Sequence, residues 1–163
     1  MRTIKIGFSK PHNRKLPVGS WAIRAYLRTN YSHTYISFYS EKLERELIYE
    51  AMGKGTRFVS RGMWNEHNEE VEVFEITLSD DNYKKLLQFC IDCAGSEYGF
   101  LQNLGIFIAD ILNMDTNPFK EGVNCSEMVG LILESEGYEL NKESDLLTPK
   151  DINEILKNGK INS

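Results

Sequence analysis

The sequence predicts an α+β domain, because segments with strand features fill its first half and segments with helical spacing fill its second half. Strands and helices do not alternate along the chain, which favours an α+β arrangement over an alternating parallel fold. A length of 163 residues suits one compact domain. Since no repeat, low-complexity run or linker divides the sequence, we expect a single domain over residues 1–163.

Five segments of the first half have the alternation, or the content of Tyr, Ile and Phe, that is typical of strands. They cover residues 3–8, 33–39, 46–52, 56–59 and 71–78. Prolines and glycines predict a loop over 10–19, after which Ser20 is expected to cap a short helix through Leu27. Gly53 and Gly55 predict a turn after the third strand.

Helical signals dominate the second half of the chain. Ser79 predicts the cap of a helix that Gly95 ends. Residues 100–112 predict a second, largely buried helix. A third helix is expected to open at Asn124 or Cys125, and a last short one, capped by Thr148, to run to residue 156.

The net charge of −5 and the sequence pI of about 5.3 argue against a broad nucleic-acid-binding surface. Basic residues near the start form either a local patch or, more simply, a solvated loop and helix face; they are Lys10, Arg14, Lys15, Arg24 and Arg28. The first residues lack the apolar core of a signal peptide, and the longest apolar stretch, 101–112, is too short to span a bilayer. We therefore expect a cytoplasmic protein with no integral membrane segment and no nucleic-acid partner.

Cys125 is the candidate nucleophile among the three cysteines. It lies where a loop is expected to become a helix, so its thiol would face unpaired backbone amides and the positive end of the helix dipole. Both favour the thiolate, which is the reactive form, and the same amides can stabilise an oxyanion. A small buried cysteine is the plainer interpretation of this position.

His33 is the candidate base for Cys125, because it opens a predicted strand at the end of a loop, where an imidazole can take a thiol proton. Glu50 is the candidate third residue. It lies on the strand expected to pair with the His33 strand, where its carboxylate would orient the ring. Two plainer interpretations stay open, a structural histidine and a salt-bridged glutamate on the solvent-facing side of the sheet. The apolar Ile48 and Met52 share the predicted strand face of Glu50, so a glutamate there needs an explanation.

The remaining histidines and cysteines predict no metal or cofactor site. Cys90 and Cys93 form a CxxC pair, but Cys90 lies on the apolar side of a helical pattern, which favours core packing. His12 and His67 lie in predicted loops without ligand partners at metal spacing. The connection that contains His67 and Trp64 is long enough to be a candidate cleft wall or lid.

Four segments of the sequence are informative through their order and spacing. They are Ser-His-Thr-Tyr-Ile at 32–36, Tyr-Glu-Ala at 49–51 with a following Gly-x-Gly, Asn-Cys-Ser-Glu-Met-Val at 124–129 and Thr-Pro-Lys-Asp-Ile at 148–152. Together they resemble the circularly permuted NlpC-type peptidases of the papain-like superfamily, in which the histidine strand precedes the cysteine helix. The YiiX-like group is nearest, lecithin retinol acyltransferase is a distant relative, and the resemblance covers roughly residues 3 to 157.

The resemblance implies a papain-like antiparallel sheet with the cysteine-bearing helix packed against it. It implies Cys125 as nucleophile, His33 as base and Glu50 as the residue that orients His33. Members of this family cleave peptides or cell-wall peptides, or transfer lipid acyl groups, through a thioacyl-enzyme. Family distribution favours a bacterial or phage source, for which the host cytoplasm or the virion is a further location.

A second hypothesis of a different class is a papain-like module kept for binding, such as a phage-particle component. The presence of Cys125, His33 and Glu50 together favours catalysis over this alternative. The sequence leaves open the substrate, the choice between hydrolysis and acyl transfer, and the oligomeric state.

Overall fold

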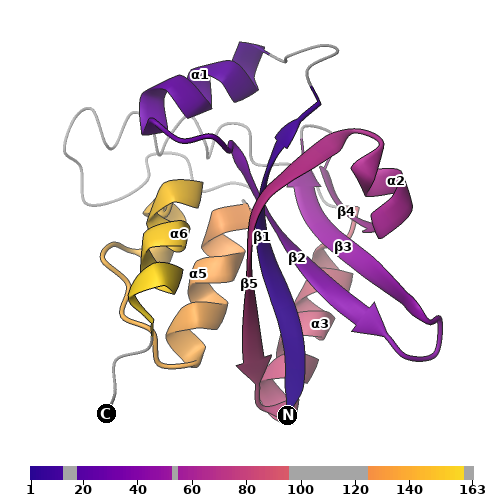
Figure 1. The fold of residues 1–163 in the computed structure, drawn as a ribbon. Coiled ribbons are helices and arrows are strands. Elements are labelled where there is room, and N and C mark those ends of the chain that lie inside the picture. Colours follow the sequence, from indigo (N-terminus) through magenta and orange to yellow (C-terminus); the bar gives the residue numbers. More distant parts are fainter. Residues whose placement is uncertain (13–17, 53–54, 96–124, 160–163) are drawn as a thin grey trace.

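The structure, a computed structural model, describes residues 1–12, 18–52, 55–95 and 125–159. Within these ranges, five strands form one sheet in the order β4-β3-β2-β1-β5, with antiparallel neighbours throughout. The strands are β1 (Arg2–Pro11), β2 (His33–Ser40), β3 (Arg45–Met52), β4 (Gly55–Ser60) and β5 (Asn68–Leu78) (Figure 1). The prediction of an α+β fold with strands first and helices later is confirmed.

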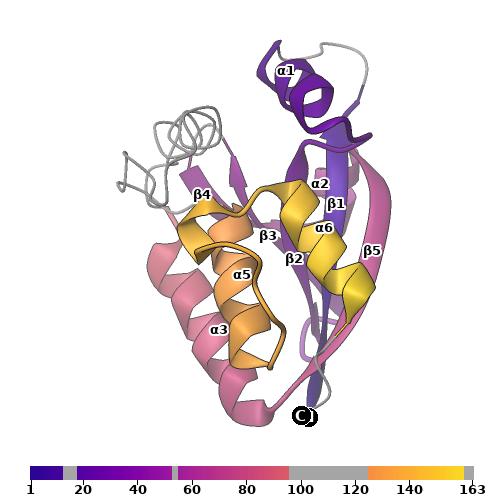
Figure 2. The same ribbon diagram turned by 90° about the vertical axis from the view of Figure 1, so that its left-hand side faces the viewer.

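Three helices cover one face of this sheet: α3 (Asp80–Cys93), α5 (Cys125–Ser135) and α6 (Pro149–Asn158) (Figure 2). The short 3-10 helix η2 (Ser144–Leu146) precedes α6, and the short helix α2 (Arg61–Asn65) lies between β4 and β5. A further helix, α1 (Val18–Leu27), stands beyond one end of the strands in both views. No helix within the described ranges combines the length and the hydropathy that crossing a membrane requires.

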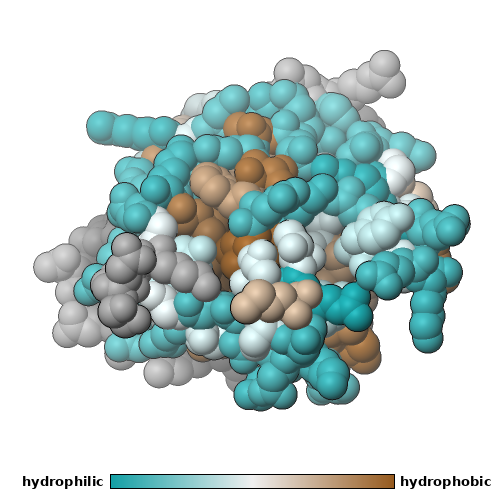
Figure 3. Space-filling view, turned by 60° about the horizontal axis from the view of Figure 1, so that its bottom comes forward, coloured by the Kyte–Doolittle hydropathy of each residue, from teal (hydrophilic) through white to brown (hydrophobic). Residues whose placement is uncertain are grey.

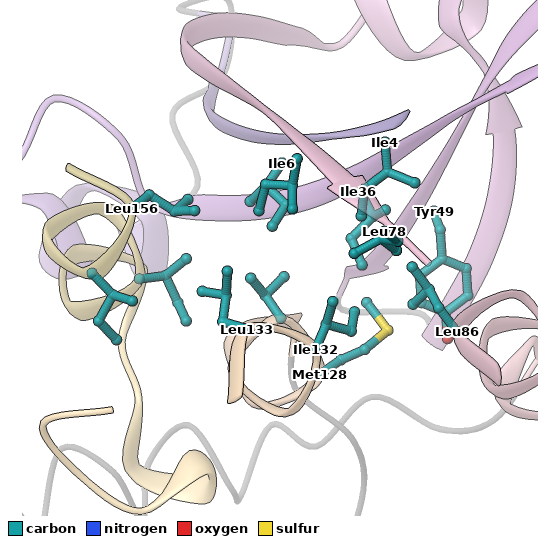
Figure 4. Close-up of a cluster of buried hydrophobic side chains, with 14 of the residues drawn as sticks. Ile4, Ile6, Ile36, Tyr49, Leu78, Leu86, Met128, Ile132, Leu133 and Leu156 are labelled. Carbon is teal, nitrogen blue, oxygen red and sulfur yellow. The ribbon is translucent and has the colours of Figure 1, made fainter. Parts of the chain in front are cut away.

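Side-chain alternation along the strands explains which face the helices cover. Ile4, Ile6 and Phe8 of β1 share one face with Ile36 and Phe38 of β2, and all five side chains are buried. Residues of the three covering helices complete this core, among them Leu86, Met128, Ile132, Leu133 and Leu156 (Figure 4). Each such buried side chain stabilises the fold by roughly 1.5–3 kcal/mol.

Local capping signals begin α3 and α6 as the sequence predicts, and Gly95 ends α3. The Ser79 hydroxyl accepts a hydrogen bond from the Asn82 amide at 3.1 Å, and Gly95 follows α3 with a φ of +88°. Thr148 and Asp151 form a reciprocal capping box at the start of α6, with Pro149 in the first turn.

A smaller cluster lies on the other face of the sheet, under α2. Tyr35, Ile48 and Trp64 form it, with the Tyr35 and Trp64 ring centroids 4.5 Å apart. The Tyr35 ring crosses β1 directly over Gly7, where any Cβ atom would overlap the ring. From there the Tyr35 hydroxyl donates to Glu70 of β5 and accepts from Arg61 at 3.0 Å. This cluster therefore ties α2 to three strands.

One face of the molecule is mostly hydrophilic at its surface. On the face drawn in Figure 3, hydrophobic side chains gather at one hollow and polar side chains surround them (Figure 3).

Two sequence expectations differ from the structure, and a third concerns residues that the structure does not describe. Helix α1 begins at Val18, so Ser20 lies inside the helix instead of capping it, and its hydroxyl lies 2.7 Å from the Ser32 hydroxyl. The connection between β4 and β5 contains α2, which the sequence analysis took for a loop. The predicted helix over 100–112 lies outside the described residues.

Candidate functional site

His33 and Glu50 lie at the same end of the sheet. His33 is the first residue of β2 and pairs with Ser9, near the end of β1. Glu50 lies near the end of β3, which runs antiparallel to β2. The opposite end holds the Met1 amino group, 3.0 Å from Asp80 at the start of α3. The predicted pairing of the two strands is therefore correct, and it brings the two side chains together.

The His33 ring and the Glu50 carboxylate face each other at this end. His33 Nε2 lies 3.5 Å from Glu50 Oε2, and the Glu50 side chain has an exposed fraction of 0%. The His33 side chain is largely buried. Because Nε2 faces Glu50, Nδ1 is the ring nitrogen that can act as a base toward another group.

Two further side chains hold the Glu50 carboxylate. The indole Nε1 of Trp64 donates to Oε2 at 2.9 Å, so α2 fixes one carboxylate oxygen. Arg57 of β4 donates to Oε1 from Nε at 2.9 Å and from a terminal guanidinium nitrogen at 2.6 Å. The carboxylate thus has donors on both oxygens, as a buried charged group requires.

Opposing influences act on the pKa of Glu50. Burial is the largest one and raises the pKa, whereas the hydrogen bonds and positive charges of His33 and Arg57 lower it. The lowering influences prevail, so the Glu50 pKa lies below its usual value. The carboxylate is therefore ionised at neutral pH and favours the imidazolium form of the neighbouring His33 ring.

Cys125 is the first residue of α5, as the sequence predicts. Helix α3 ends near Glu50, because the Gly95 amide donates to the carbonyl of Thr56, which pairs with Ala51. Helix α5 runs antiparallel to α3: Asn82, early in α3, donates to Glu136 just after α5 ends. The start of α5 therefore lies at the sheet end that carries His33 and Glu50, and the Cys125 side chain itself lies outside the described part of the structure.

His33 and helix α5 lie on opposite faces of the sheet, which limits where Cys125 and His33 can make contact. By alternation along β2 and β3, His33 and Glu50 belong to the sheet face that carries Trp64. Helix α5 packs on the other face. A thiol at the start of α5 would therefore have to meet the His33 ring at the end of the sheet, beyond the last paired residues of β1 and β2.

The other two cysteines, Cys90 and Cys93, lie in environments that disfavour the thiolate. Cys90 is buried in the core, with its Sγ atom 3.8 Å from Met128 Sδ, and burial strongly raises its pKa. Burial is also the main cause of the raised pKa of Cys93. The prediction that Cys90 packs in the core is confirmed.

His12 and His67 are both exposed and lie beside α2. The His12 amide donates to the carbonyl of His67 at 2.9 Å, and His12 Nε2 lies 2.9 Å from the carbonyl oxygen of Asn65. Among the described residues, no three His, Cys, Asp or Glu side chains gather as they would around a metal ion.

Arg57 is a site residue that the sequence analysis missed, and Trp64 was named there only as part of a candidate cleft wall or lid. The sequence carried a usable signal for Arg57, because the antiparallel pairing of β3 and β4, in which Met52 pairs with Gly55, places Arg57 directly opposite Glu50. The sequence carried no signal for the contact between Trp64 and Glu50, because this contact depends on how α2 folds back over the sheet.

No family model matches the sequence, and no curated protein matches it either.

Proposed function

We propose that this chain is a cysteine-dependent hydrolase or acyltransferase, with Cys125 as nucleophile, His33 as base and Glu50 as the residue that orients His33. The observation that carries the proposal is the buried, ionised Glu50 within 3.5 Å of His33 Nε2, at the sheet end where α5 begins with Cys125. A carboxylate in that position holds one ring nitrogen and leaves Nδ1 to exchange protons with a thiol. The family resemblance of the four sequence segments supports the same assignment.

In the proposed reaction, His33 Nδ1 takes the proton of the Cys125 thiol, and the thiolate attacks a carbonyl carbon of an amide or ester. Amide groups of the first turn of α5 can stabilise the oxyanion that forms. The imidazolium then gives its proton to the leaving amine or alcohol, and a thioester remains. Water or an acceptor amine attacks this thioester, His33 takes its proton, and the thiol is regenerated. Candidate acyl donors are peptides, cell-wall peptides and lipid acyl groups.

The second candidate is a non-catalytic papain-like binding module. The observation that favours it is the tight contact of Arg57 with Glu50, at 2.6 and 2.9 Å, which is closer than the 3.5 Å contact of Glu50 with His33. In this candidate Glu50 has no catalytic role, and its contacts with Arg57 and Trp64 serve only to join β3, β4 and α2.

Trapping of the thioester distinguishes the cysteine-dependent enzyme from the non-catalytic binding module. We expect incubation with activated esters of N-acyl amino acids and of fatty acids to add one acyl group to Cys125, as intact and peptide mass spectrometry would detect. Hydroxylamine should remove the group, since it cleaves thioesters. The Cys125→Ala variant should gain no such group, whereas Cys90→Ala serves as the matched control and should behave like the wild type.

An acyl group that persists in Cys125→Ala, or that maps to Cys90 or Cys93, would contradict the proposal. Absence of any adduct with every donor would favour the binding module.

A further inference from the structure

Helix α1 turns its hydrophobic side chains toward solvent. Trp21 has an exposed fraction of 60%, and Ile23 and Tyr26 are also exposed. Ala22 and Ala25, between them, are exposed as well. Solvent-facing helix surfaces are normally polar, so a surface of this composition indicates an interaction site.

The polar residues of α1 lie on its other side. Ser20 and Arg24, one turn apart, are only partly exposed. The Ser20 hydroxyl contacts the Ser32 hydroxyl, and the Nε atom of Arg24 is buried. Ser20, Arg24 and Leu27 thus form the side of the helix that faces the protein, and the exposed apolar residues on the outward side do not belong to the core.

The sequence around α1 is basic. Residues 12–40, which include this helix, contain four Lys and Arg and no acidic residue, whereas the whole chain has a net charge of −5. The exposed Arg28 follows α1 and lies next to its apolar surface, whereas the Nε atom of Arg24 is buried. Lys10 lies 3.2 Å from Glu69 and is partly neutralised. A binding partner of this region is therefore expected to carry negative charge.

We infer that α1 binds the surface of an anionic lipid bilayer, with Trp21, Ile23 and Tyr26 inserted at the level of the headgroups. Tryptophan and tyrosine favour this level because each combines an apolar ring with a polar group. Arginine side chains can bury their methylene groups at the interface while the guanidinium contacts phosphate. A helix with outward aromatic residues and flanking basic ones fits such a surface better than it fits the uniformly charged backbone of a nucleic acid.

Docking through α1 would bring the candidate site to the bilayer. Ser32, which contacts α1 through Ser20, is the residue before His33. Figures 1 and 2 show α1 beyond the strand end where β2 begins. The inference does not depend on the proposed function, since a protein without catalytic activity would bind lipid through the same surface.

Vesicle co-sedimentation of the full chain tests the inference. We expect binding to vesicles of phosphatidylcholine mixed with phosphatidylglycerol, and much weaker binding to vesicles of phosphatidylcholine alone or at high salt. Trp21→Ser should weaken binding about tenfold or more, because an inserted aromatic side chain is lost. Arg28→Gln should weaken binding roughly fivefold.

Tyr39→Ser is the matched control, because Tyr39 of β2 has an exposed fraction of 61%, close to that of Trp21, but does not belong to α1. A spectroscopic measurement is independent of sedimentation: the chain has two tryptophans, and Trp64→Phe leaves only Trp21 to report. Its fluorescence should shift to shorter wavelength when anionic vesicles are added.

Three results would overturn the inference. The first is a lack of binding to anionic vesicles. The second is equal binding by Trp21→Ser and Tyr39→Ser. The third is a dimer in vesicle-free solution that Trp21→Ser dissociates, which would assign the surface of α1 to a second copy of the chain.

Discussion

Replacing His33 with alanine is expected to slow the alkylation of Cys125 by iodoacetamide about tenfold or more at pH 5. In the proposed pair the thiolate persists well below pH 7, whereas a free thiol titrates near 8.5 and is only about 0.03% ionised at pH 5. The amides at the start of α5 still favour the thiolate in the variant, so its concentration falls by up to about three powers of ten. A more basic thiolate is intrinsically more nucleophilic, which restores one to two of these powers of ten.

The measurement is the alkylation rate of Cys125, followed by peptide mass spectrometry, as a function of pH. His67→Ala is the matched control, because His67 is an exposed histidine beside α2, and its profile should equal that of the wild type. Glu50→Gln should have a smaller effect than His33→Ala, since the base remains and only its orientation and charge partner change. Identical profiles for the wild type and His33→Ala, with circular dichroism showing both folded, would mean that the two residues do not act as a pair.

Replacing Gly7 with alanine is expected to lower the free energy of unfolding by about 3 kcal/mol, at the upper end of the usual cost of overfilling a packed site. The added Cβ would overlap the Tyr35 ring. The ring cannot move aside easily, because it packs on Trp64 and its hydroxyl is bound by Arg61 and Glu70. Displacement of Tyr35 should also disturb Trp64, and through it the Glu50 carboxylate.

Denaturant unfolding of Gly7→Ala and Gly62→Ala measures this effect against a matched control. Gly62 lies in α2, and no atom lies within 4 Å of the Cβ that alanine would add there. Gly62→Ala should therefore leave the stability unchanged or raise it by up to about 1 kcal/mol, because alanine is the better helix former. Equal stabilities of the two variants would mean that Tyr35 does not pack over Gly7 as described.

Strands with a strong alternation could be predicted from the sequence, and so could helices with clear caps. In the last part of β5 the buried Ile76 and Leu78 alternate with exposed residues, which is the periodicity that the sequence displays. The caps at Ser79 and Thr148 depend on residues within one turn, so local sequence is sufficient to predict them.

Elements whose position depends on distant contacts could not be predicted in this way. Helix α2 has only five residues and contains Gly62, so it carries neither periodicity nor propensity. Its position depends on Trp64 and Arg61, which bind partners on β2, β3 and β5. The start of α1 was misplaced because Ser20, a favourable cap by type, uses its hydroxyl to contact Ser32 instead.

In the candidate site, too, the features that follow from strand pairing could be predicted, and those that depend on distant contacts could not. The neighbouring positions of His33 and Glu50 follow from the pairing of two predicted strands, and the opposition of Glu50 and Arg57 follows from a short hairpin. The complete burial of Glu50 does not follow from the sequence, because it requires Trp64 to fold over the carboxylate. The interpretation of Glu50 as a salt-bridged residue is correct for its contact with Arg57, and the interpretation as a solvent-facing residue is wrong.

The distance between Cys125 Sγ and His33 Nδ1, measured in a crystal structure of the full chain, tests the central claim most directly. A nucleophile and its base lie within about 3–4.5 Å of each other even when apo geometry is loose. We predict a distance in this range, with Glu50 on the Nε2 side of the same ring. A separation of more than about 8 Å, which far exceeds hydrogen-bond reach, would contradict the assignment of Cys125 and His33 as a catalytic pair.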